Sequence, residues 1–293
     1  MDRKQWLIVQ KLIRLAVKEV GPTPEAKYSD VLVLSMYIWS VSQDRPLSWA
    51  CQRSNYGNCF RPRRLPSVSQ FCRRVKTERF QAFLQAIHRA LTADSRLANL
   101  NFLDGKPLAV GNCSRDPDAK NGYGAGCMQR GYKLHALVTG ERKIASWSVL
   151  PLNVHEMPVA RVMLDEVPRI PTGAVIMADG NYDSHVLHKD VSQRGAWLWV
   201  KPRGMAEHPV TLRQMGAARR ALLQVWRDDP EGSERISRQR VAVEGTFSNL
   251  TSYGGGLGPL PSFVRRLERV RRWVGTKIIL YHVRLASRME QAA

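Results

Sequence analysis

Two aspartates of this chain stand where strand-like runs of apolar residues end. Asp104 lies in the segment LNFLDGKPLAVG and Asp179 in GAVIMADGNYDS, and each precedes a glycine that predicts a turn. Ligand sites in α/β sheets gather at strand ends, so the two side chains can act together if their strands are neighbours. We therefore expect an acidic pair at one edge of a sheet.

A third acid, Glu244, lies in SRQRVAVEGTFSNL, where apolar residues recur at helical spacing. Burying a carboxylate in so apolar a stretch is costly unless a metal or another cation pairs with it. Arg240 precedes Glu244 by one helical turn. The three acids predict a cation-binding set built from two strand ends and one helix.

The elements that must position these acids alternate after residue 100. Three strands come first, and a helix, a strand, a second helix and a last strand follow. Their expected ranges are 100–104, 131–139 and 144–152 for the strands, then 157–167, 173–180, 183–195 and 196–202. This order suits an α/β fold, with a mixed sheet and helices packed on it. Beyond Arg213 the chain is helical again, interrupted at DDPEGSE and at the glycine-rich YGGGLGPLP.

The first hundred residues have a helical pattern. Helices are expected at 3–20 and 29–41, then after the cap residue Ser67, and at 77–91. The short helix after Ser67 and its neighbour could form a helix-turn-helix that places one helix in a DNA groove. The basic composition of this region favours DNA contact.

Charge separates this protein from most globular chains. It has 293 residues with 45 Lys and Arg against 25 Asp and Glu, a net charge of +20 and a pI near 10.3. Such an excess favours a polyanionic partner, and nucleic acid is the leading candidate. The longest apolar window, 31–41, is too short to span a bilayer, and the N-terminus lacks a signal-peptide cleavage site, so we expect a cytoplasmic, nucleoid-associated protein without membrane contact. Five cysteines without a CxxC pair predict reduced thiols.

Several segments after residue 100 occur in a characteristic order: FLDGKPLAVGNCSRDPDAK, GYKLHALV, MADGNYDS, RVAVEGTFSNL and RRLERVRRWVGTKIILYHVRL. In this order they resemble the DDE transposases of bacterial insertion sequences. The resemblance covers about residues 100–286. It implies a ribonuclease-H-like catalytic domain whose first and fourth strands are adjacent, and it places the catalytic Asp, Asp and Glu at Asp104, Asp179 and Glu244.

The resemblance also implies metal chemistry. Asp104, Asp179 and Glu244 would bind two Mg²⁺, with Mn²⁺ as a substitute, because hard cations prefer oxygen ligands. Two such ions, roughly 3.5–4 Å apart, activate a water or a DNA 3′-hydroxyl and stabilise the leaving oxygen. Asp104 is the expected bridging ligand. Arg240 resembles the family arginine near the glutamate, and we expect it to hold a phosphate.

The chain departs from the family pattern at two positions. Ser237 stands where the family has a tyrosine, and Thr251 stands where it has a lysine. Other basic residues are therefore expected to grip the DNA end. The full set expected to contact DNA is Arg73, Arg74, Lys76, Lys133, Arg240, Arg265, Arg266, Arg269, Arg272 and Lys277. Glu268 is a possible partner of Arg272.

Some neighbouring residues have competing interpretations. Asp116 and Asp118 compete with Asp104 for the first ligand position, but their setting predicts a solvated loop. Asp183 is expected near the cap of the next helix, and His135 is interpreted as structural. A supporting role for His155, with Asn153, stays open. The tryptophans Trp147, Trp197 and Trp199 are expected to pack within strands.

The sequence thus predicts a DNA transposase that cleaves insertion-sequence ends and transfers the 3′-hydroxyl to target DNA. Its partners would be terminal inverted repeats and target DNA, bound by a homodimer. Residues 1–98 would form a helical DNA-binding and dimerisation domain, and residues 99–293 the catalytic domain with C-terminal helices. A non-catalytic DNA-binding relative, a nuclease that only hydrolyses, and a basic scaffold for RNA remain the alternatives.

Overall fold

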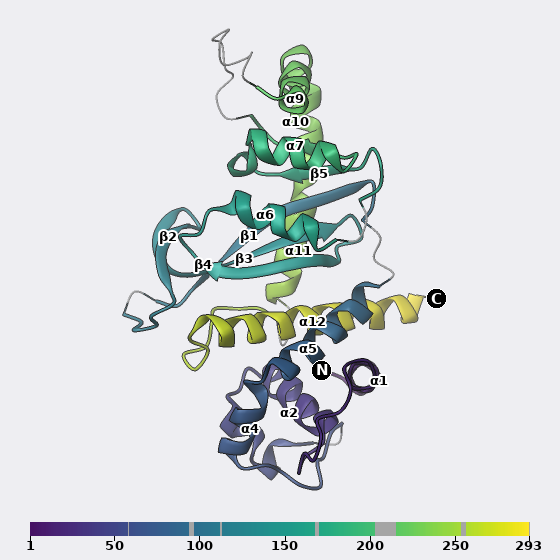
Figure 1. The fold of residues 1–293 in the computed structure, drawn as a ribbon, viewed down its shortest axis with the longest axis vertical. Coiled ribbons are helices and arrows are strands. Elements are labelled where there is room, and N and C mark those ends of the chain that lie inside the picture. Colours follow the sequence, from purple (N-terminus) through teal and green to yellow (C-terminus); the bar gives the residue numbers. More distant parts are fainter. Residues whose placement is uncertain are drawn as a thin grey trace. The chain divides into compact units, whose positions relative to one another are not determined.

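The computed structural model describes residues 1–57, 59–93, 97–111, 113–167, 170–202, 215–252 and 256–292 (Figure 1). The chain forms two compact units: Met1–Asp94 with Asn249–Ala293, and Ser95–Ser248. The predicted boundary near residue 98 lies close to the change between units. The sequence prediction placed residues 249–293 in the catalytic domain, but in the structure they group with the N-terminal helices.

The first unit is helical in its described parts. Its elements are α1 (Arg3–Val20), α2 (Asp30–Ser42), α3 (Leu47–Ala50), η1 (Arg53–Asn55), α4 (Val68–Val75), α5 (Glu78–Thr92) and α12 (Leu267–Ala292). Helix α1 packs against α2, α5 and α12, and α12 also packs against α2 and α5. The apolar window at 31–41 is α2, which is buried along most of its length.

Local capping explains where these helices begin. The Asp2 carboxylate accepts a hydrogen bond from the backbone N–H of Gln5, and Ser67 and Gln70 form a capping box at the start of α4. The Thr77 hydroxyl caps α5 by accepting the backbone N–H of Phe80. The predicted starts of these helices are confirmed, since capping is encoded within a few residues of each end.

The second unit is built on a six-stranded mixed sheet, shown behind α6 in Figure 1. Its strands are β1 (Leu100–Ala109), β2 (Lys120–Gly124), β3 (Cys127–Thr139), β4 (Ile144–Pro151), β5 (Val175–Ala178) and β6 (Trp197–Trp199). The order is β2-β3-β1-β5-β6, and β4 also pairs with β3. Strand β3 is antiparallel to β1, β2 and β4, whereas β1, β5 and β6 are parallel. The adjacency of the first and fourth predicted strands, here β1 and β5, is confirmed.

Two details of the sheet differ from the sequence prediction. Strand β1 does not end at Asp104 with a turn at Gly105, because it continues to Ala109. From Gly105 to Ala109 it remains hydrogen-bonded to β3, although its parallel partner β5 has already ended at Ala178. The short strand β2 was not predicted. Its glycine-rich composition does not favour a strand, and it is a strand because it pairs with β3.

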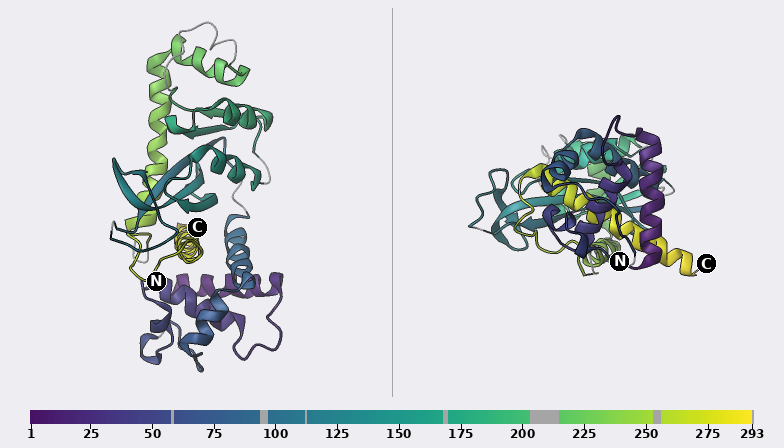
Figure 2. Two further views of the ribbon diagram at one scale, coloured as in Figure 1. Left: turned by 60° about the vertical axis from the view of Figure 1, so that its left-hand side comes forward. Right: turned by 90° about the horizontal axis from the view of Figure 1, so that it is seen from below.

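Helices cover both faces of this sheet, as the first view of Figure 2 shows. Helices α6 (Glu156–Asp165) and α7 (His185–Gln193) pack on one face, over a core that includes Leu103, Leu137 and Ile176. The 3₁₀ helix η2 (Gly180–Tyr182) joins β5 to α7. On the other side run α10 (Pro230–Ser237), η3 (Arg238–Arg240) and α11 (Val241–Ser252), preceded by α9 (Ala217–Asp228). The α/β prediction with a mixed sheet is confirmed.

The region around α9 and α10 was predicted only coarsely. Helix α9 begins at Ala217, while Arg213, where the prediction began, lies outside the described residues. The predicted break at DDPEGSE shrinks to Asp229, which caps α10 by accepting a hydrogen bond from the Gly232 N–H. Residues 253–255 of the glycine-rich segment also lie outside the described residues.

Two global expectations can be compared with the fold. The five cysteines are free thiols, as predicted. In the part of the chain that the structure describes, no helix is both long and apolar enough to cross a membrane.

Candidate active site

Asp104 and Asp179 lie side by side at one edge of the sheet. In the parallel pairing of β1 with β5, Leu103 is opposite Ala178, so the two aspartates are the next residues in register. Leu103 and Ala178 belong to the core under α6 and α7. Because side chains alternate along a strand, Asp104 points to the opposite face, where α11 lies. The expected acidic pair is therefore present in the backbone register.

Burial dominates the electrostatics of Asp104, whose side chain is 16% exposed. It raises the pKa of this carboxyl to about 6, and the negative charges of Asp179 and Glu156 act in the same direction. Two groups oppose this rise in pKa. The Gly105 N–H donates to Oδ1 at 2.8 Å, and the Arg240 guanidinium lies nearby. Asp104 is thus a partly desolvated acid that gains from any added positive charge.

Asp179 is held by the turn that follows β5. Its Oδ1 accepts the Asn181 backbone N–H at 2.8 Å, and its Oδ2 accepts the Asn181 side-chain amide at 3.0 Å. Asp179 is also the cap residue of η2. The sequence Asp-Gly-Asn therefore fixes the direction of the carboxylate just beyond the strand end.

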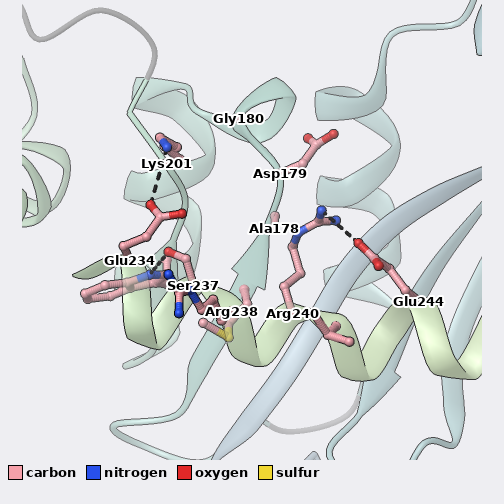
Figure 3. Close-up of a pocket in the computed structure, with 12 residues that line it drawn as sticks. Ala178, Asp179, Gly180, Lys201, Glu234, Ser237, Arg238, Arg240 and Glu244 are labelled. Atoms are coloured by element: carbon pink, nitrogen blue, oxygen red, sulfur yellow. Dashed lines mark hydrogen bonds and ion pairs between the residues drawn. The ribbon is translucent and has the colours of Figure 1, made fainter. Parts of the chain in front are cut away.

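Glu244 comes from the helix that faces the strand ends. Arg240 bridges it to Asp104, with Nη2 3.2 Å from Glu244 Oε1 and Nη1 3.5 Å from Asp104 Oδ2. Figure 3 shows Arg240 rising from its helix toward the strand end that carries Asp179, with Glu244 beside it. The premise that Glu244 is buried among apolar residues was wrong. Its side chain is 57% exposed, because α11 buries Val243, Phe247 and Leu250 instead.

A cleft of about 340 Å³ runs from Asp179 and Glu244 along the helix (Figure 3). One wall is formed by the ends of β5 and β6, with Ala178, Asp179, Trp199 and Lys201 among its residues. The other wall is one face of the helical run α10, η3 and α11. The members of this face recur every three or four residues, as neighbours on a helix do: Glu234, Ser237, Arg238, Arg240, Val241 and Glu244.

The donor chemistry of this edge fits hard divalent cations. Such ions take carboxylate oxygens and water. Two carboxylates, Asp104 and Glu244, pair here with Arg240, whose positive charge stands in for a cation between them, and Asp179 lies beside Asp104 in the sheet. Across the described ranges, no group of three His, Cys, Asp or Glu side chains is close enough to hold one ion. A side chain would therefore have to turn for all three acids to reach the same ion.

Asp116, the rival of Asp104, is not in a solvated loop as predicted. It is 4% exposed, and its Oδ2 accepts the hydroxyl of Tyr132 at 2.7 Å. Its Oδ1 accepts the backbone N–H of Asp118. These bonds brace the segment before β2, so Asp116 has a structural setting. Asp183 does not cap α7, which Ser184 does; its buried carboxylate binds Arg219 through both oxygens.

The residues on the α6 face of β1 and β3 form a second charged group. Lys133 Nζ lies 2.6 Å from Glu156 Oε1, and both side chains are 12% exposed. Lys133, expected to contact DNA, is therefore tied to α6. His135 is buried, and burial lowers its pKa to about 4, which favours the neutral ring. His155 is the N-cap residue of α6. It is exposed, and its side chain makes no capping hydrogen bond.

The basic residues of the helical unit divide by exposure. Arg73 on α4 and Lys76 at its C-cap are exposed, whereas Arg74 forms an ion pair with buried Asp30. Near the start of α12, Arg266 and Arg269 are exposed, and Arg265 donates to the backbone carbonyls of Leu260, Pro261 and Val264.

Two of the expected DNA contacts are buried instead. Arg272 is 8% exposed, and Lys277 is 1% exposed with its ammonium 2.6 Å from Asp44. Their burial argues against a role in DNA contact, since a phosphate cannot reach them in this packing. Glu268 pairs with Arg271 rather than with Arg272.

Sequence reasoning missed the far end of the cleft. Lys201 Nζ lies 3.3 Å from Glu234 Oε2, and the Trp199 indole N–H donates to Ser237 Oγ at 3.0 Å. Trp199 lines the cleft, and Trp197 is 54% exposed, so these tryptophans do not simply pack within the sheet. The available signal was the position of Lys201 near the end of a short strand, as Asp179 is near the end of β5.

Comparisons with known proteins identify the family of this chain. A family model described as Transposase DDE domain matches residues 97–281. No curated protein matches the chain in sequence. A structurally similar solved protein is a piggyBac transposase, in a synaptic complex with hairpin DNA. It has 8% sequence identity and a TM-score of 0.49, and the match covers 98% of this chain and 74% of that chain. Because the family model spans more than half of the sequence and includes all three acids, the chain belongs to the transposase DDE domain family.

Proposed function

We propose that this protein cuts the ends of an insertion sequence and joins the freed 3′-hydroxyl to target DNA. The family membership supports a transposase in general. The observation that carries the finer proposal is the register of β1 and β5, which sets Asp104 beside Asp179 opposite Glu244. An acidic edge facing a helix-borne acid across an open cleft suits phosphoryl transfer on a bound strand.

Each residue of the edge has a role in this proposal. Asp104, Asp179 and Glu244 would hold two divalent cations, Mg²⁺ or Mn²⁺, whose chemistry is to activate the attacking oxygen and stabilise the leaving one. Arg240 would exchange its carboxylate partners for a phosphate of the bound strand, because guanidinium pairs well with phosphate oxygens. The Asn181 bonds to Asp179 keep that carboxylate aimed at the cleft edge.

Double-stranded DNA is the proposed partner. The net charge of +20 supplies the non-specific attraction to phosphates, and exposed Arg73 on α4 and Lys76 at its C-cap are candidates for contact with the terminal repeats. Two element ends must be handled together in transposition. We therefore propose that two copies of the chain assemble on DNA.

The experiment is a cleavage and strand-transfer assay on labelled duplexes that carry the inverted repeats flanking the reading frame. With Mg²⁺ or Mn²⁺, the wild-type chain should nick the repeat end and join a pre-cut 3′-hydroxyl to target DNA. Asp179→Asn and Glu244→Gln should each lose on the order of 10³-fold in rate or more, because several kcal/mol of transition-state stabilisation disappear.

Glu141→Gln is the matched control. Glu141 is an acid of the same unit, 64% exposed in the turn after β3 and remote in sequence from the cleft residues. Its variant should keep wild-type rates. Cleavage without joining would instead identify a nuclease that only hydrolyses. Equal inactivity of wild type and Asp179→Asn on every repeat end would leave a DNA-binding protein without catalysis.

A further inference from the structure

Charged residues stand at neighbouring positions on three parallel strands. Asp104 lies within β1, Asp179 directly follows β5, and Lys201 lies two residues beyond β6. Strand β6 continues the register of β1 and β5, with Trp199 opposite Met177. Two residues farther along, Lys201 therefore takes the position on β6 that Asp179 takes on β5. Across these three strands, from β1 to β6, the charged groups are the carboxylates of Asp104 and Asp179 and the ammonium of Lys201.

The opposite wall carries charges that pair with these: a carboxylate, a guanidinium and a carboxylate, at Glu244, Arg240 and Glu234. Glu244 and Arg240 face the two aspartates, and about three helical turns earlier Glu234 faces Lys201. The two ends share one cleft, so a strand held at the acids extends past Lys201 or away from it. Figure 3 shows Lys201 and Glu234 pointing toward each other across this end, beside Arg238.

The Lys201–Glu234 ion pair is weak enough for an incoming phosphate to replace Glu234. Its atoms are 3.3 Å apart, and the side chains are 69% and 45% exposed, so water screens their attraction and the net stabilisation is small. Beneath the pair, the bond from Trp199 to Ser237 ties β6 to α10 and fixes the wall. A phosphate that replaced Glu234 would bind both Lys201 and the exposed Arg238.

We propose that this end of the cleft is a second phosphate subsite, which binds the backbone of the cleaved DNA strand beyond the reacting phosphate. Lys201 and Arg238 are its cations. Glu234 forms an ion pair with Lys201 as long as no DNA is bound. This subsite rests on the proposed function for the identity of the strand. It also accounts for how the chain grips DNA with Ser237 where the family has a tyrosine.

Binding of duplex DNA carrying the inverted repeat, measured by fluorescence anisotropy over a range of salt in EDTA, tests the subsite without cleavage. Lys201→Gln should lower affinity several-fold and reduce the slope of log K against log salt by about 0.9, the loss of one phosphate contact. Glu234→Gln should raise affinity several-fold, because its carboxylate no longer competes for Lys201. In the double variant, the gain from Glu234→Gln should vanish.

Lys189→Gln is the matched control, since Lys189 is an exposed lysine of α7 on the other face of the sheet. Lys201→Gln with the same affinity and slope as this control overturns the subsite, and so does weaker binding by Glu234→Gln. A duplex with single neutral methylphosphonates locates the contact. A methylphosphonate at one position should weaken DNA binding by the wild type and leave DNA binding by Lys201→Gln unchanged. The absence of such a position also overturns the proposal.

The same variants separate this subsite from the proposed function. If wild type cleaves and joins DNA while Lys201→Gln binds like the control, the subsite fails and the function stands. If wild type binds through Lys201 but neither cleaves nor joins any repeat end, the function fails and the subsite remains a DNA contact.

Discussion

In the helical unit, the ion pairs of Arg74 and Lys277 each have one buried member, whereas at the sheet edge Arg240 and Lys201 lie beside an open cleft. Lys277 has no exposed side-chain surface, and Asp30, the partner of Arg74, is 5% exposed. In the cleft, Glu244 is 57% exposed and Lys201 69%. The residue types are the same, and the access of solvent differs.

That difference decides what each pair can do. A buried charge must keep its partner, because an unpaired charge in the interior costs several kcal/mol. An exposed pair is weakly held, so an incoming ion or phosphate can replace either member. We therefore assign the pairs of the helical unit to stability and those of the cleft to ligand exchange. The following predictions test that division, from the largest expected effect to the smallest.

The Lys277–Asp44 pair should respond asymmetrically to substitution. Asp44→Asn should lower the free energy of unfolding by about 3 to 4 kcal/mol, because the buried ammonium of Lys277 loses its partner. Asn retains the left-handed backbone of this position, where φ is 53°, so backbone strain does not contribute. Burial already lowers the pKa of Lys277, consistent with a charge that depends on this carboxylate.

Lys277→Met is the companion variant, measured by urea denaturation of the full chain. It removes the buried charge and leaves Asp44, which is 53% exposed, in water. Its free energy of unfolding should stay within about 1 kcal/mol of wild type. Equal destabilisation by both variants would show that the ion pair itself is favourable, and the contrast with the cleft would lose its basis.

Asp104 lies between the two classes, since its carboxyl is mostly buried but pairs with Arg240, which lines the cleft. Its pKa in the folded chain is about 6, above its ordinary value of 3.8, so folding favours the protonated form. The wild-type chain should therefore lose stability as pH rises from about 4 to 6 and regain none of it above 6. Asp104→Asn should remove this loss, which amounts to up to about 3 kcal/mol.

The measurement is the difference in unfolding free energy between Asp104→Asn and wild type, in EDTA, at pH 4, 5, 6 and 7. The variant should match wild type at pH 4 and exceed it at pH 7. A difference independent of pH would mean that Arg240 fully compensates the ionised carboxylate. In that case the acidic edge would carry no electrostatic strain for a cation to relieve.

Much of the fold was predictable because its signals are local or carried by the family pattern. The caps Ser67 and Thr77 mark helix starts within three residues, and apolar alternation marks β3 and β4. The adjacency of Asp104 and Asp179 came from the resemblance. The residues alone left it conditional, since no local pattern specifies which strands pair.

The residues that were misjudged depend on distant partners. Lys277 looked like a DNA contact in a basic helix, but its partner Asp44 lies 233 positions earlier. Lys201 meets Glu234 only because β6 and α10 form two walls of one cleft. Strand β1 continues past Asp104 because β3, not β5, supplies its hydrogen bonds there. No periodicity within a segment records contacts of this kind.

The smallest effect should come from the exposed pair at the start of α12. Glu268 and Arg271 are 2.9 Å apart, one helical turn from each other, and their side chains are 63% and 37% exposed. Glu268→Gln should change the free energy of unfolding by about 0.5 kcal/mol or less, and 1 M NaCl should abolish that change. The effect of Asp44→Asn should survive the same salt, because screening ions do not reach Lys277. If salt erased both effects alike, burial would not be what distinguishes the two kinds of ion pair, and Lys277 would return as a candidate for DNA contact.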